Sequence, residues 1–132
     1  MPKKIVVMSE LKLQQMQHEI NTWKRMLGFM QEENVHLKNR LSEVLKDRFN
    51  KELLDTVEFY QTKFIEEDEM IVLLKTKVSE LENTLLNTIT SNDNNDALLS
   101  KKIEKLRKGI DDAEKKFNSV NNNFNKYLAE NI

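Results

Sequence analysis

Three features of this 132-residue sequence predict an all-α protein built from three long helices. Apolar residues recur at alternating spacings of three and four over residues 13–44, 57–85 and 99–127, which is the period of one helix face. The chain contains one proline and two glycines, so few residues interrupt a helix. A run of serine, asparagine and aspartate at residues 91–96 predicts a turn before the third stretch.

The first helix is predicted over residues 9–46, after a tail at residues 1–8. Ser9 is a favourable first cap because its hydroxyl accepts a hydrogen bond from a free backbone N–H. Apolar residues occupy heptad positions a and d, except for Asn34 at a. We expect this stripe to form an association seam, in which the principal residues are Leu13, Ile20, Trp23, Leu27, Met30, Leu37 and Leu41.

The second helix is predicted over residues 50–91 and the third over residues 96–130. Between them we expect a loop at residues 92–96, with Asp96 as the cap of the third helix. In the second helix, Glu67 is the one charged residue at the a and d positions. The third helix is apolar at all of them, so each helix has one face to bury.

The junction at residues 46–51 allows two arrangements, because it lacks glycine and proline while the apolar stripe changes phase there. A turn would make residues 1–132 one domain, either an antiparallel bundle or a coiled-coil hairpin. A continuous helix would give an elongated parallel dimer with the third helix folded back. Charges at g followed by e, such as Glu19 before Lys24, are typical of parallel coils. The sequence leaves both arrangements open.

Two polar residues interrupt the stripes, and such residues often fix the register between helices. If the chain turns near residue 50, Asn34 and Glu67 fall in nearly the same layer, with Val120 close by. We then expect Asn34 to donate a hydrogen bond to Glu67. If the helix is continuous, the two residues lie far apart and Asn34 meets its symmetry mate.

Additional apolar residues broaden the stripe of the second helix, which two-sided packing or an oligomer interface would explain: Phe59, Ile65, Met70, Val72 and Leu73. Met26 and Phe29 broaden the first helix in the same way. Gly28 and Gly109 lie inside predicted helices, where glycine is unfavourable. Close backbone approach at a helix crossing is the expected reason for both glycines.

No catalytic motif is present, so we predict a protein that is not an enzyme and needs no cofactor. Glu33 and His36 have the Glu-x-x-His spacing of carboxylate metal sites. A second such motif is missing, His18 has no glutamate three residues before it, and cysteine is absent. We therefore expect two surface histidines and no metal site, and we infer no small-molecule substrate.

Nucleic acid and membranes are not expected partners. The net charge is −1, and the lysines between residues 101 and 116 alternate with acidic residues, as on a salt-bridged helix surface. No apolar run approaches the roughly 20 residues of a membrane span. No secretory signal is recognisable either, so the expected location is the cytoplasm.

Residues 58–65, Glu-Phe-Tyr-Gln-Thr-Lys-Phe-Ile, are followed by Glu69, Ile71 and Leu74. This segment resembles a stretch of short uncharacterised helical proteins of Bacteroidetes-group bacteria. The resemblance implies a bacterial, cytoplasmic helical protein and supplies no catalytic residues.

The expected function is association, through a homo-oligomer, with a dimer favoured, or through a helix of another protein. The alternatives are a small ligand- or metal-binding bundle and an adaptor of a bacterial signalling or secretion assembly.

Overall fold

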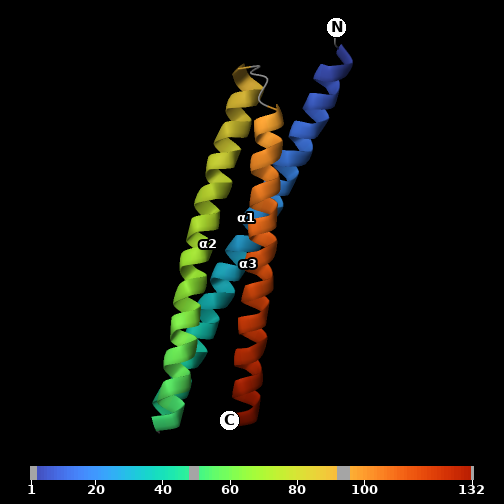
Figure 1. Cartoon of the computed structure of the whole chain (residues 1–132). Coiled ribbons are helices and arrows are strands. Elements are labelled where there is room, and N and C mark those ends of the chain that lie inside the picture. Colours follow the sequence, from blue (N-terminus) through green and yellow to red (C-terminus); the bar gives the residue numbers. More distant parts are fainter. Residues whose placement is uncertain (1–2, 48–50, 92–95, 132) are drawn as a thin grey trace.

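The structure is a computed structural model that describes residues 3–47, 51–91 and 96–131. These residues form three α-helices and no strand: α1 (Lys3–Asp47), α2 (Lys51–Ser91) and α3 (Asp96–Asn131). In Figure 1, α2 and α3 run side by side, while α1 crosses them at an angle and its N-terminal end points away. The prediction of an all-α three-helix bundle is confirmed.

The helix boundaries lie within one residue of those predicted, except at the start of α1. α1 begins at Lys3, so Ser9 lies within the helix instead of capping it. Residues 3–8 contain no glycine or proline, and serine costs little inside a helix, so a favourable cap does not force the helix to begin there. Of the predicted junction at residues 46–51 and the predicted loop at residues 92–96, residues 48–50 and 92–95 lie outside the described residues, and the others belong to the helices.

α1 and α2 pack against each other as an antiparallel hairpin, which excludes the continuous helix. Three contacts link the two helices at intervals of seven residues, and the residue number rises along α1 as it falls along α2. They join Lys24 to Glu82 at 2.5 Å, Gln31 to Lys75, and Lys38 to Asp68 at 2.5 Å. All six occupy position e of their own helix. The two ion pairs therefore form within one chain, where the sequence had suggested pairing in a parallel dimer, because antiparallel helices bring e against e.

The core follows the predicted stripe closely. Every a and d residue from Met16 to Val44 and from Val57 to Thr88 is buried, with at most 8% of its surface exposed. In α3 the same holds from Leu99 to Phe117. Beyond that point the stripe drifts: Leu128 is buried, although it lies one residue past the predicted position. A helix has 3.6 residues per turn and the heptad assumes 3.5. In a fairly straight helix the heptad positions therefore rotate gradually away from the core.

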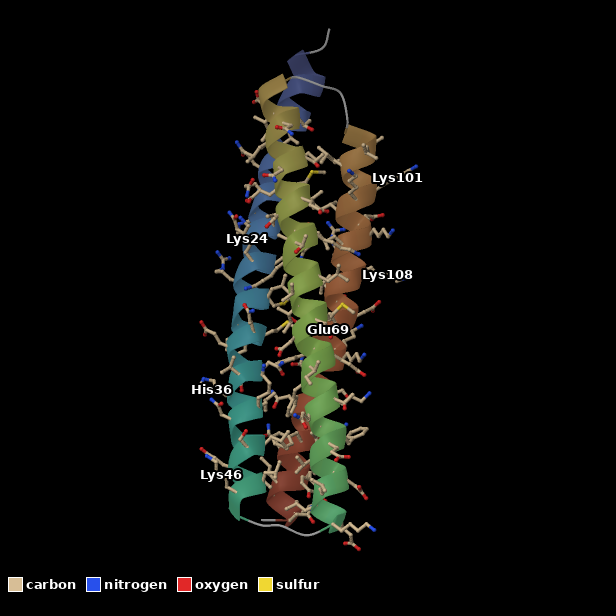
Figure 2. All side chains as sticks on the ribbon, turned by 90° about the vertical axis from the view of Figure 1, so that its left-hand side faces the viewer. Lys24, His36, Lys46, Glu69, Lys101 and Lys108 are labelled. Atoms are coloured by element: carbon tan, nitrogen blue, oxygen red, sulfur yellow. The ribbon has the colours of Figure 1, made fainter. Side chains whose placement is uncertain are left out.

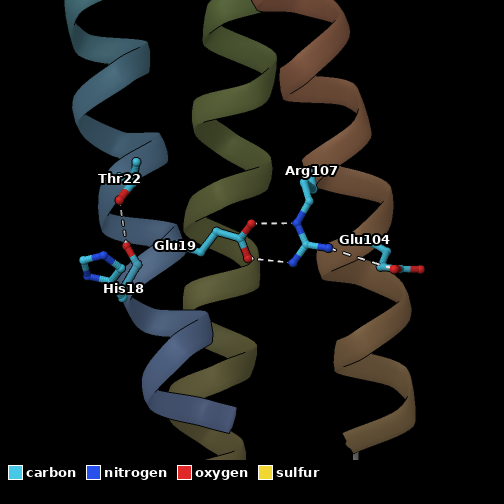
Figure 3. A network of polar contacts seen from close by, with 5 residues as sticks. All are labelled: His18, Glu19, Thr22, Glu104 and Arg107. Atoms are coloured by element: carbon cyan, nitrogen blue, oxygen red, sulfur yellow. Dashed lines mark hydrogen bonds and ion pairs between the residues drawn. The ribbon is translucent and has the colours of Figure 1, made fainter. Parts of the chain in front are cut away.

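α3 is held to both other helices. Aromatic rings join it to α2 near its C-terminus, with centroids 5.0 Å apart for Tyr60 and Phe124 and 5.1 Å for Phe64 and Phe124. Arg107 joins it to α1 through two bonds to Glu19, from Nε at 2.6 Å and Nη2 at 2.7 Å (Figure 3). A forked pair fixes orientation as well as distance.

Candidate functional site

The predicted association seam lies inside the chain. Ile20, Trp23, Leu27, Met30, Leu37 and Leu41 are each at most 6% exposed, and Leu13 is partly buried against the same core. The hairpin brings α2 and α3 onto the stripe that a second chain was expected to cover. These residues therefore hold one chain together, and any contact with another chain must use a different surface.

The predicted polar layer is present, but its hydrogen bonds differ from the expected one. Asn34 is fully buried, and its amide nitrogen donates to the Phe64 carbonyl at 2.9 Å and to Asp68 Oδ1 at 2.6 Å. Asp68 Oδ2 accepts from Lys38 at 2.5 Å. Asn34 therefore bonds to residues three before and one after Glu67, and not to Glu67 itself. The buried Oδ1 of Asn34 has no hydrogen-bond partner.

Glu67 is 2% exposed, yet neither of its carboxyl oxygens is among the fully buried atoms that lack a hydrogen-bond partner. Burial raises the pKa of Glu67, and neighbouring Glu66 acts in the same direction. Lys116 on α3 and Lys63 on α2 oppose that rise in pKa. Burial therefore disfavours the charged form of this carboxyl, and the two lysines offset the effect only in part.

The residues in the structure that could be metal ligands do not converge. No group of three or more histidine, aspartate or glutamate side chains suited to a metal ion occurs among the residues described. His18 and His36 are both exposed, and Figure 2 shows His36 on the outer side of α1. Glu33 and His36 therefore have no third potential metal ligand beside them among the described residues.

One face of α2 remains apolar and uncovered after the bundle has formed. The side chains that form this α2 outer face are 38–55% exposed: Phe59, Ile65, Met70, Val72 and Leu73. Packing on both sides of α2 within the chain therefore does not explain them. On α1, Phe29 is 63% exposed, whereas Met26 packs against the core.

The two glycines do not mark a close helix crossing, contrary to the prediction. A Cβ atom added at Gly28 would have no neighbour within 4 Å, and one at Gly109 would meet only Leu74 Cδ2 at 3.9 Å. Gly109 instead lies beside a cleft of about 370 Å³ between α2 and α3. The sequence does not predict this cleft, because its size depends on how far the two helices stand apart.

No protein-family model, curated protein or solved structure matches this chain. Within the described ranges, none of the three helices has the length and apolar character needed to cross a membrane. The geometry of the bundle is therefore the basis for the functional proposals.

Proposed function

We propose that this chain acts through protein–protein association, with the α2 outer face as the contact surface and a second copy of the chain as the first partner. The observation that carries this proposal is the exposure of five large apolar side chains between Phe59 and Leu73. Large apolar side chains exposed close together on one helix are typical of interaction sites. The resemblance of residues 58–74 adds the expectation of a bacterial cytoplasmic setting.

Charge supports a second copy as the partner. Glu66 and Glu69 lie exposed among the apolar residues of the α2 outer face, where Glu66 pairs with Lys63 at 3.7 Å and Glu69 forms no ion pair with a described residue. α3 carries Lys101, Lys108 and Lys115 at seven-residue spacing, all exposed and none in an ion pair with another described residue. In Figure 2, Lys101 and Lys108 project away from the bundle. The chain thus offers both an acidic, apolar surface and a basic one, and lysine stems can cover apolar residues.

The expected affinity is low. In a two-fold dimer both copies bury this face, so ten side chains that are about half exposed offer roughly 1 kcal/mol each, or about 10 kcal/mol together. After the cost of association, about 4 kcal/mol or more, roughly 6 kcal/mol or less remains. Dimerisation should therefore appear at micromolar to millimolar concentration, with charge complementarity deciding the value.

Light scattering across that concentration range tests the proposal. We expect the mass to rise from the 15.6 kDa of one chain towards twice that value. Ile65→Glu with Val72→Glu should abolish the rise, because the pair places two carboxylates on the α2 outer face. The matched control is Gln14→Glu with Asn39→Glu, which adds the same charge at exposed positions of α1.

Two results would contradict self-association. One is a mass of a single chain at every concentration, with a melting temperature independent of concentration. The other is an equal loss of association in the control pair, which would attribute the effect to net charge alone. An adaptor that binds another protein would use the same surface with a different helix in place of the second copy.

A further inference from the structure

The cleft between α2 and α3 has an apolar floor. Leu74, Leu81 and Leu106 form this floor and are 4%, 5% and 7% exposed. Gly109 leaves the floor open, because a side chain at this position would project beside Leu74. The volume of about 370 Å³ lies near the lower end of the range for small-molecule pockets, about 300–1,000 Å³.

The rim of the cleft is cationic. Lys77 on α2 and Lys102 and Lys105 on α3 surround it, against the single acid Glu80. All three lysines are exposed, and none forms an ion pair with a described residue. Their charges are therefore available to a ligand in the cleft.

A second hollow of about 270 Å³, between α1 and α2, provides a contrast within the same molecule. Lys24 and Lys75 line it, but Lys24 is paired with Glu82 and Lys75 donates to Gln31. Both hollows are lined by apolar residues and lysines. Of these two hollows, only the α2–α3 cleft combines an apolar floor with lysines that form no ion pair with a described residue.

We infer that the α2–α3 cleft binds a small anionic amphiphile, with an alkyl chain on the leucine floor and a carboxylate at the lysine rim. The apolar floor accounts for the chain, and the excess of three lysines over one glutamate accounts for the sign of the head group. Lysine stems extend the apolar wall while their ammonium groups stay in water. This inference does not depend on the proposed association.

Titration with decanoate below its micelle concentration, followed by ¹H–¹⁵N spectra, tests the site. The chain has only two glycines, and glycine amides fall in a well-separated spectral region. Gly109 borders the cleft and Gly28 does not. We expect the Gly109 signal to shift in a saturable manner while the Gly28 signal stays in place. Equal shifts of both signals, or none at Gly109, would overturn the inference.

Head-group charge is tested with neutral decanol and cationic decyltrimethylammonium in place of decanoate. Binding should weaken from decanoate to decanol and from decanol to decyltrimethylammonium. Lys77→Gln and Lys105→Gln should each weaken decanoate binding about two- to fivefold, as expected for an exposed charge pair. Lys46→Gln, at an exposed position of α1, is the matched control and should have no effect. Cation binding as tight as that of decanoate would overturn the role of the rim.

The apolar floor is tested by filling it. Gly109→Leu should abolish binding, while Gly28→Leu, at a position with open space, should leave it unchanged. Gly109→Ala is the milder variant, since its Cβ makes only an ordinary contact, and should weaken binding measurably. Circular dichroism verifies that each variant is folded.

The titration is repeated on the Ile65→Glu, Val72→Glu variant, so loss of association and loss of the cleft remain distinguishable. Unchanged binding in both Gly109 variants would overturn the proposal.

Discussion

Asn34 is the buried polar residue for which the structure provides a specific partner on the facing helix. Its amide bridges the Phe64 carbonyl and Asp68, and Asp68 in turn holds Lys38. In a double-mutant cycle, Asn34→Ala and Asp68→Ala should therefore show a coupling energy of about 1 kcal/mol in urea unfolding. Asn34→Ala with Glu82→Ala, two heptads away, should be additive within about 0.5 kcal/mol. Additivity of the first pair would show that this hydrogen bond contributes nothing to stability.

Glu67 should make the bundle less stable as pH rises, because burial raises the pKa of its carboxyl. The folded chain then holds this proton to a higher pH than the unfolded chain does, so stability falls between the ordinary and the raised pKa. Glu67→Gln should remove this fall and stabilise the protein by about 1 kcal/mol at neutral pH. Urea unfolding from mildly acidic to neutral pH measures both effects.

Glu82 provides a control of opposite sign for that experiment. Hydrogen bonds from Lys24 and Gln17 lower the pKa of Glu82, so its contribution is present above the ordinary glutamate pKa and is lost as pH falls through the lowered one. Glu82→Gln should therefore reduce stability at neutral pH and not at low pH. If Glu67→Gln behaved in the same way as Glu82→Gln, the assignment of a raised pKa to Glu67 would be wrong.

Helices α1 and α3 each contain a glycine that their packing does not require. A Cβ at Gly28 or Gly109 meets nothing closer than 3.9 Å. Gly28→Ala and Gly109→Ala should each stabilise the protein by about 0.5–1 kcal/mol through helix propensity. In thermal melts this corresponds to an increase of about 2–5 °C. A decrease at either position would show that the helices approach there more closely than described.

Sequence periodicity predicts the faces of the helices better than it predicts what those faces contact. The a and d residues at 16–44, 57–88 and 99–117 are buried, because a 3-4 repeat places its apolar residues on one face of each helix. The same repeat does not distinguish antiparallel from parallel neighbours, so the possible pairing of Glu19 with Lys24 between two chains gives way to pairs of Lys24 with Glu82 and of Glu19 with Arg107. The start of α1 was also misplaced, since Ser9 tolerates a helix interior.

The surfaces of the whole molecule were only partly foreseeable. The apolar residues of the α2 outer face stand out in the sequence, but their exposure follows from the position of α1 and α3 on the other sides of α2. The α2–α3 cleft depends on the spacing of two helices, which no local pattern encodes. Gly109 and the unpaired lysines around it were visible only as separate features until the fold placed them together.

The up-down-up order of an odd number of helices has an electrostatic consequence. α1 and α3 begin at the end of the bundle where α2 finishes, as Figure 1 shows. Each helix carries roughly half a positive charge at its N-terminus and half a negative charge at its C-terminus. The dipole of α2 opposes those of α1 and α3 and can cancel only one of them. One dipole is left without an opposing partner, so the two ends of the bundle are electrically unequal. The end where α1 and α3 begin therefore carries the excess of helix N-termini, and Lys102 lies in the second turn of α3 at that same end.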